Sequence, residues 1–249
     1  MLRRDFLVGI MATPIFAAFS NSNILSINNQ STNDFFPEDE ILGLVEPILC
    51  GEQFCLRNEA MEAYLEMAYE AQKSGIKLWC PSAYRDFTYQ KNIWNAKYKA
   101  MAKLGMKQHH IVNEILQYSS LPGTSRHHWG TDIDIVDALG YQIENPLNFL
   151  NFNTLGEFQY LKYWLDNHAK SFGFVEVYTN DSTRTGFKYE PWHFSYAPIS
   201  KPILKQLLAI DFTQIEALKQ CKGYGLFDST FYSKIKTEYL LGINKELIG

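Results

Sequence analysis

The stretch Ser125–Val136, which reads SRHHWGTDIDIV, decides the fold because its second half alternates like a β-strand. Ile133 and Ile135 fall on one face of this strand. Asp132 and Asp134 fall on the other face, as the two-residue period of a strand requires. A histidine pair precedes the strand by a short turn. The pattern predicts a half-buried strand with a carboxylate face and an imidazole near its start.

The segments on both sides of this strand contain further helices and strands. Apolar residues recur at helical spacing in two stretches, which predicts helices at residues 57–74 and 87–104. Four more helices are expected at residues 110–118, 157–171, 201–218 and 229–241. Two more strands are expected at residues 76–84 and 187–196. Because helices and strands are mixed without regular βαβ alternation, the expected class is α+β, with a central antiparallel sheet flanked by helices.

The composition excludes several classes of protein. The chain of 249 residues is 46% hydrophobic, which is ordinary for a globular protein and rules out general disorder. Its formal net charge is -4, and Lys and Arg form no dense basic stripe along the sequence. Since neutralising phosphates needs clustered cations, nucleic acid is not expected as a partner.

The amino terminus resembles an export signal. An Arg-Arg pair precedes an apolar run at residues 8–19, which is too short for a stable membrane span. The string Arg-Arg-x-Phe-Leu resembles a twin-arginine signal, although an ordinary secretory signal has the same outline. We expect residues 1–22 to be the export signal and residues 23–40 a linker. The protein would then be exported to the periplasm or cell envelope, with membrane contact only through an uncleaved signal.

Cys50, Cys55, Cys80 and Cys221 fit no paired zinc knuckle. In an exported protein they could form two disulfides, with Cys50–Cys55 as the easiest local closure. Buried free thiols are the equal alternative, and the sequence does not choose between the two.

Polar residues from two predicted strands together make the components of a hydrolytic metal site. His127 and Asp134 belong to the first stretch, and His193 comes from the predicted strand 187–196. Two imidazoles and one carboxylate suit Zn²⁺ and leave one coordination position open. Glu190, three residues before His193, needs a bend at Pro191 to come beside this group without ligating the metal.

Neighbouring residues leave alternatives open. His128 rivals His127, and Asp132 rivals Asp134, because spacing alone does not say which neighbour faces the metal. The remaining histidines are expected to be ordinary surface or core residues: His109, His110 and His168.

Three motifs together resemble a known family. Residues 125–134 resemble S-x-H-x-x-G-x-A-x-D, residues 190–193 match E-x-W-H, and residues 82–90 resemble S-G-Y-R-S-x-x-x-Q. With these motifs the chain resembles the zinc D-alanyl-D-alanine peptidases of the VanX and VanY type, which are related to lysostaphin and the hedgehog amino-terminal domain. The resemblance spans residues 80–197.

The resemblance implies a role for each matching residue. His127, Asp134 and His193 take the places of the zinc ligands, with one Zn²⁺ per chain. Glu190 takes the place of the general base, and Arg85 that of the arginine that stabilises the oxyanion. Substrate contacts are implied for Ser125, Gln90 and Trp192.

Several of these residues also have simpler structural alternatives. Arg85 could form a surface ion pair, and Gln90 could be exposed to solvent. Ser125 could cap a turn, and Trp192 could belong to the core. Asp132 stands where the family has a small residue, so it could hydrogen-bond a ligand histidine or add unfavourable negative charge.

The resemblance implies a hedgehog/D,D-peptidase-like fold, with a zinc peptidase domain at residues 41–210 and a helical C-terminal extension at residues 211–249. The expected function is a D,D-carboxypeptidase that removes the terminal D-alanine from peptidoglycan stem peptides. An L,D-carboxypeptidase or an endopeptidase acting on the same polymer is the nearest alternative. A zinc-containing wall-binding module without hydrolysis is the rival from another class.

Overall fold

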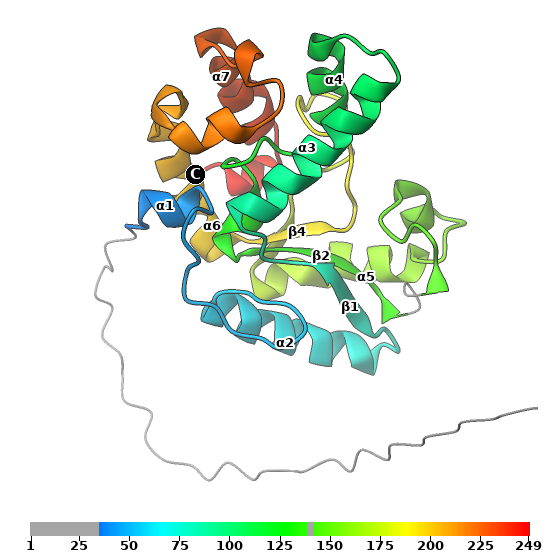
Figure 1. The fold of residues 1–249 in the computed structure, drawn as a ribbon. Coiled ribbons are helices and arrows are strands. Elements are labelled where there is room, and N and C mark those ends of the chain that lie inside the picture. Colours follow the sequence, from blue (N-terminus) through cyan, green and yellow to red (C-terminus); the bar gives the residue numbers. More distant parts are fainter. Residues whose placement is uncertain (1–34, 139–141) are drawn as a thin grey trace, which may run out of the picture. The chain divides into compact units, whose positions relative to one another are not determined.

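A four-stranded antiparallel sheet forms the centre of the computed structural model (Figure 1). Its strands stand in the order β1-β2-β4-β3: β1 (Leu78–Ser82), β2 (Asp132–Asp137), β4 (His193–Tyr196) and β3 (Phe174–Glu176). Helices flank this sheet, which confirms the predicted α+β class. The structure describes residues 35–138 and 142–249, so the predicted export signal and most of the predicted linker lie outside the described residues.

The alternation predicted for the central strand is present in β2. Its two isoleucines are fully buried in the layer that contains α2 (Asn58–Lys73) and α5 (Gln159–His168). Asp132 and Asp134, which alternate with them along the strand, face the opposite layer. Asp132 is in register with Ser195 of β4, and Asp134 with His193. The polar face of the sheet is therefore built from β2 and β4 together.

The opposite layer holds the remaining helices. In Figure 1, α3, α4 and α7 lie above the sheet and α2 lies below it. The apolar side chains of this upper layer form one buried cluster. The helices of the layer are α1 (Glu38–Ile41), α3 (Phe87–Lys103), α4 (Gln108–Ile115), α6 (Ala197–Ala209) and α7 (Ser229–Lys234).

Short helical turns connect these elements. Those that lie wholly within the described residues are the 3-10 helices η1 (Arg126–Trp129), η3 (Phe149–Phe152), η4 (Ala169–Phe172), η5 (Phe212–Gln214), η6 (Glu216–Gln220), η7 (Tyr224–Leu226) and η9 (Lys245–Leu247), and the π-helix η8 (Ile235–Leu240).

Most of the predicted helices are confirmed, with ends shifted by a few residues. Helices α2, α3, α4 and α5 correspond to the predictions for residues 57–74, 87–104, 110–118 and 157–171. Helix α7 and the π-helix that follows it occupy the predicted stretch 229–241. The first strand, predicted at residues 76–84, is confirmed as the shorter β1.

Two predictions are wrong in extent. The strand expected at residues 187–196 begins only at His193, because the residues before it form a loop and Pro191 has no N–H for a ladder. The helix expected at residues 201–218 is displaced, since α6 ends at Ala209 and 3-10 turns follow. Strand β3 and helix α1 were not predicted, because elements of 3 and 4 residues carry too little periodicity.

Residues 211–249 pack into the same hydrophobic cluster as α3, α4 and α6. Phe212, Tyr232 and Tyr239 are among the buried side chains that this segment contributes. At the other end of the chain, α1 lies partly within the predicted linker 23–40, and its Ile41 is buried in this cluster too. The domain boundaries at residues 40 and 210 stay predictions.

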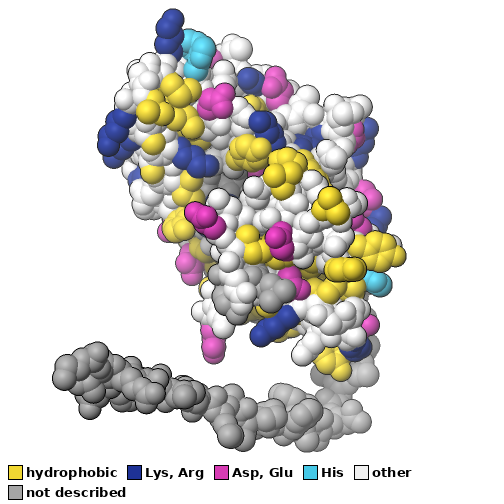
Figure 2. Space-filling model, turned by 90° about the vertical axis from the view of Figure 1, so that its right-hand side faces the viewer, with side chains coloured by type: hydrophobic (Ala, Val, Ile, Leu, Met, Phe, Trp, Pro, Cys, Tyr) yellow, Lys and Arg dark blue, Asp and Glu magenta, His cyan; other side chains and the backbone are white. Residues whose placement is uncertain are grey.

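Among the described residues, we find no helix with the length and apolar character needed to cross a membrane. Figure 2 shows Lys and Arg side chains interspersed with Asp and Glu on one face of the molecule.

The four cysteines all lie in the described part of the chain and are free thiols in the structure. Cys80 and Cys221 are buried, and burial raises the pKa of Cys221 to about 12. The structure therefore has the thiol alternative rather than the two disulfides.

Candidate metal centre and cleft

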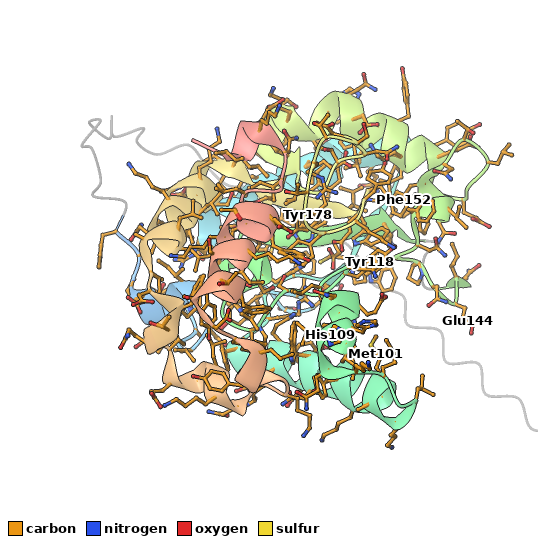
Figure 3. The ribbon with its side chains drawn as sticks, turned by 90° about the horizontal axis from the view of Figure 1, so that it is seen from above. Met101, His109, Tyr118, Glu144, Phe152 and Tyr178 are labelled. Carbon is orange, nitrogen blue, oxygen red and sulfur yellow. The ribbon has the colours of Figure 1, made fainter. Side chains whose placement is uncertain are left out.

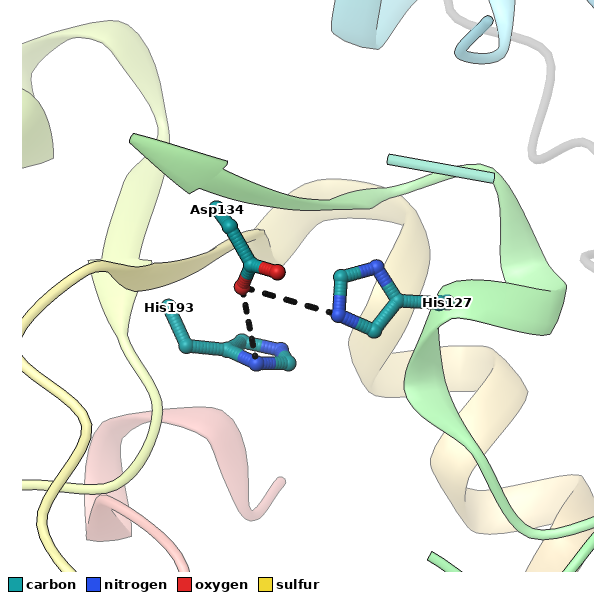
Figure 4. Close-up of side chains that lie close together, drawn as sticks. All are labelled: His127, Asp134 and His193. Atoms are coloured by element: carbon teal, nitrogen blue, oxygen red, sulfur yellow. Dashed lines mark ion pairs between the residues drawn. The ribbon is translucent and has the colours of Figure 1, made fainter. Parts of the chain in front are cut away.

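Three ligand-type side chains meet on the polar face of the sheet (Figure 4). His127 comes from η1, Asp134 from β2, and His193 from the first residue of β4. Their ligand atoms all lie within 4.8 Å of one another, and the three residues are buried. Nε2 of His127 lies 3.6 Å from Oδ1 of Asp134, and Nδ1 of His193 lies 3.5 Å from the same oxygen. The structure thus brings together the three residues predicted as metal ligands.

A hydrogen bond holds the second nitrogen of each histidine. Nδ1 of His127 lies 2.7 Å from the backbone oxygen of Ala83, which can only accept, so Nδ1 carries the proton and Nε2 is left free. Burial and the charge of Arg85 lower the pKa of His127, which keeps this imidazole neutral. Nε2 of His193 lies 3.1 Å from Oδ1 of Asp132, which leaves Nδ1 for the metal side. In their neutral forms, both rings therefore direct a lone pair to one point.

Asp132 is the centre of a buried network behind His193. Arg126 donates through Nε to Oδ1 of Asp132 at 2.8 Å. Ser195 and Thr131 donate their hydroxyl protons to Oδ2, at 2.9 and 2.7 Å. Burial raises the pKa of Asp132, but the charge of Arg126 and the hydrogen bond from His193 outweigh it and lower the pKa to about 2. Asp132 thus hydrogen-bonds a ligand histidine as an anion, which is one of the two alternatives that the sequence left open.

The donor set fits a zinc ion. Oδ1 of Asp134 is buried and has no hydrogen-bond partner among residues 35–138 and 142–249. Burial raises the pKa of Asp134 to about 6, although the charges of His193 and Arg85 act in the other direction. A buried carboxylate oxygen without a hydrogen-bond partner is stabilised by a cation. Two histidines and one aspartate are ligands that Zn²⁺ takes at sites that keep one position open.

Glu190 reaches this centre through a tight turn. The backbone N–H of His193 donates to the oxygen of Glu190 at 3.1 Å, and the N–H of Glu190 donates to the oxygen of Tyr178 at 3.0 Å. Oε2 of Glu190 then lies 3.4 Å from Nδ1 of His193. The bend expected at Pro191 is therefore present, and it places a second carboxylate beside the three ligands.

A cavity of about 570 Å³ lies over the metal centre and is lined by the three ligands and Glu190. Arg85, Gln90 and Trp192 line the same cavity. Nε of Arg85 is buried without a hydrogen-bond partner in the described part of the chain, so the surface ion pair considered above does not form. Ser125 is also buried, but it is not among the residues that line the cavity. Of the predicted substrate contacts, the structure brings Gln90 and Trp192 to the cleft.

Other residues that line the cavity were not predicted from the sequence. Figure 3 shows Tyr118, Phe152 and Tyr178 around the central region of the molecule, and the two tyrosines line the cavity itself. Lys97 lines it as well, on the same face of α3 as Gln90. The spacing of these two residues, seven positions on one helix, is the signal that could have found Lys97.

The rival residues are occupied elsewhere. Nδ1 of His128 lies 2.6 Å from the backbone oxygen of Arg85, and its Nε2 accepts from the N–H of Gly123 at 3.1 Å. Both ring nitrogens of His128 are thus used in the fold. His109, His110 and His168 are exposed, as expected of residues outside the site.

Comparisons with known proteins agree with this fold and donor set. A family model described as VanY, D-alanyl-D-alanine carboxypeptidase, matches residues 53–199. A D-alanyl-D-alanine carboxypeptidase of Enterococcus faecalis is 28% identical over 157 residues, which cover 62% of this chain and 52% of the relative. This chain thus spans about half the length of that relative.

Two solved structures have the same fold. VanYB in complex with D-alanine-D-alanine is 22% identical, with a TM-score of 0.50 over 64% of this chain and 81% of that chain. A mutant of the vancomycin resistance D,D-pentapeptidase VanY, in complex with Zn(II), is 22% identical, with a TM-score of 0.50 over 63% and 82%.

The fold and the donor set define a domain with a small antiparallel sheet and a candidate zinc site on its polar face. The chain belongs to the VanY family of D-alanyl-D-alanine carboxypeptidases.

Proposed function

We propose that this protein is an exported, zinc-dependent D,D-carboxypeptidase that removes the terminal D-alanine from peptidoglycan stem peptides. One observation carries the proposal: Glu190 and Arg85 line the cavity in which the three ligand residues meet. A site that only binds zinc for structure needs neither group. A hydrolytic site needs both, as a proton carrier and as a fixed cation.

His127, Asp134 and His193 would hold the metal. Bound there, Zn²⁺ would supply Lewis acidity to a water molecule and to the scissile carbonyl. Glu190 would accept the proton of the attacking water through its carboxylate. The same carboxyl group would then donate this proton to the nitrogen of the departing D-alanine, so that one side chain serves as base and as acid.

Arg85 would stabilise the oxygen of the carbonyl under attack. Its Nε proton is buried and has no acceptor among the described residues, so a ligand oxygen would provide one. A guanidinium held in a cleft is aimed before the reaction begins, which makes it more effective than a mobile cation in water.

The proposed substrate and the proposed location of the protein are supported by separate observations. Family membership supports a substrate that ends in D-alanyl-D-alanine, and VanYB, which shares the fold, is solved with that dipeptide. Stem peptides of the cell wall carry this sequence, and they lie outside the cytoplasmic membrane. The export signal predicted at residues 1–22 supports the same location.

The proposal is tested by incubating the zinc-loaded protein with a muropeptide pentapeptide and measuring the products by mass spectrometry. We expect loss of one D-alanine, and no loss when a chelator is present. The Glu190→Ala variant should keep stoichiometric zinc but lose turnover, whereas His193→Ala should lose both. Turnover by Glu190→Ala close to that of the wild type would contradict the proposed mechanism.

Other products separate the alternatives. Chelator-sensitive cleavage of a tetrapeptide alone would identify an L,D-carboxypeptidase, and cleavage within crosslinked peptides would identify an endopeptidase. Bound zinc without cleavage of any of these substrates would support the wall-binding module instead.

A further inference from the structure

The cleft contains a positive charge that the catalytic mechanism does not use. Lys97 lines the cavity from α3 and is half-buried there. Its ammonium donates to Oγ of Ser119, and no carboxylate in the described part of the chain lies within ion-pair distance of it. A partly buried ammonium without a counter-ion loses hydration without gaining an ion pair. An anionic ligand would compensate for this loss.

Lys97 points toward the reacting centre. Gln90, Ile93 and Lys97 all line the cavity, which puts them on one face of α3 at helical spacing. Side chains on a helix lean toward its N-terminus, and the residue next to the N-cap of α3 is Arg85. The electrostatics agree, because burial lowers the pKa of Lys97 while the charge of Glu190 raises it and that of Arg85 lowers it further. Lys97 therefore lies within electrostatic range of both catalytic residues.

The charges of the cleft leave room for one anion. Among the described residues, two cations other than histidines line it, Arg85 and Lys97, and two carboxylates, Asp134 and Glu190. Asp134 is a metal ligand in the proposed site. The negative charge of Glu190 therefore remains to balance the positive charges of Arg85, Lys97 and the metal. A ligand with a negative charge is therefore favoured in this cleft.

Neutral groups beside Lys97 complete a subsite for a peptide end. Ser119 accepts from Lys97 through Oγ, and its own hydroxyl proton remains available for an acceptor. Gln90 donates through Nε2 to the oxygen of Ser120, and its buried Oε1 has no partner among the described residues. This combination provides two donors for a carboxylate and one acceptor for a peptide N–H.

We propose that Lys97 and Ser119 bind the free α-carboxylate of the substrate's last residue, with Gln90 accepting from a substrate N–H. This inference rests on the proposed function and extends it, because it makes the enzyme selective for chain ends. An endopeptidase substrate continues beyond the scissile bond and has no carboxylate there. The subsite thus favours a carboxypeptidase over an endopeptidase.

The test compares two pentapeptides that differ only at the C-terminus, one with a free carboxylate and one with a carboxamide. Wild-type enzyme should cleave the carboxylate form with the higher kcat/KM. Lys97→Met should reduce kcat/KM for the carboxylate form by about 10- to 100-fold, mainly through KM, since a hydrogen bond to a charged group is lost. The carboxamide form should change by less than about threefold.

Two further variants make the comparison specific. Lys97→Arg keeps the charge and should recover part of the preference for the carboxylate. Lys99→Met removes an exposed lysine of the same helix and should leave both peptides unaffected.

The outcomes separate this inference from the proposed function. If wild-type enzyme cleaves the pentapeptide and Lys97→Met leaves the carboxylate-to-carboxamide ratio unchanged, the subsite is overturned and the proposed function stands. Equal loss on both peptides would also overturn it, since Lys97 would then only hold the loop at Ser119. If wild-type enzyme cleaves neither peptide, the proposed function fails and the inference fails with it.

Discussion

At the scale of single residues, what a histidine can do is decided by the partner of its second nitrogen. His127 is fixed by a backbone oxygen of residue 83, and His128 next to it is used up by two backbone groups. The sequence could predict a metal-binding histidine in this stretch, but it left His127 and His128 as rivals. The choice depends on tertiary hydrogen bonds from segments about 40 residues away, which no local pattern contains.

Asp132 is the residue at which this dependence is best tested. Replacing it by asparagine removes the anion that accepts from His193 and leaves Arg126 buried without its counter-charge. We expect Asp132→Asn to weaken zinc affinity by about 10- to 100-fold, as the loss of such a partner of a ligand histidine does. Stability should also fall, by about 3 kcal/mol or more, because a buried ion pair is broken. Competition with a fluorescent chelator measures the affinity, and urea unfolding the stability.

Ser195→Ala is the matched control for this variant. It removes the hydrogen bond that Ser195 donates to the far oxygen of Asp132 and the one that Ser195 accepts from Arg126, and it keeps the Asp132–His193 contact. Its zinc affinity should stay within about threefold of the wild type, since the carboxylate that His193 contacts is kept. Equal affinities for Asp132→Asn and the wild type would show that Asp132 does not orient His193.

At the scale of elements, the local sequence pattern predicted the long helices and the central strand. It missed the short elements whose extent is set by pairing with neighbouring strands. The central strand was predictable from four alternating residues, and it holds Asp134 as expected. The strand expected at residues 187–196 was too long, because Pro191 interrupts the ladder and the turn before His193 is stabilised by a contact with Tyr178. That turn brings Glu190 to the cleft. The same turn therefore explains why the predicted strand was too long and why Glu190 lies beside the metal ligands.

The turn between η1 and β2 gives a prediction for stability. Gly130 has φ +66°, in the left-handed region, and a Cβ there would meet Cδ2 of Leu49 at 2.6 Å. Gly105 has a similar φ of +77° but open space around it. We expect Gly105→Ala to cost about 1 kcal/mol for the backbone alone. Gly130→Ala should cost about 2 to 3 kcal/mol, since Leu49 must also move. Urea unfolding measures the free energy of unfolding of both variants. Equal losses of stability would contradict the clash between the new Cβ and Leu49.

At the scale of the whole molecule, the C-terminal segment supports the loop that carries Glu190. Thr185 donates through Oγ1 to the backbone oxygen of Glu238, and Arg184 donates to that of Gly242 at 2.9 Å. Phe187, which lines the cleft, packs edge-on against Tyr239 at a centroid distance of 5.0 Å. The sequence predicted helical structure in residues 211–249 but could not assign them a role. These contacts join residues more than 50 positions apart, which local periodicity does not encode.

Zinc binding by the whole protein should release protons in a pH-dependent way. In the metal-free protein, burial lowers the pKa of His193, but hydrogen bonds to Asp132 and Glu190 outweigh it and raise the pKa to about 9. The pKa of Asp134 is raised to about 6 by burial. Both groups must be deprotonated to ligate a metal.

Between these two pKa values, His193 is the one of the two groups that still carries a proton. The affinity for zinc should therefore rise about tenfold per pH unit in this range and level off above pH ~9. Below pH ~6 both groups carry one, and the slope should steepen. Calorimetry at pH 7.5 in buffers of different ionisation enthalpy should find about one proton released per zinc, and none released would contradict the assignment of Nδ1 of His193 as a ligand.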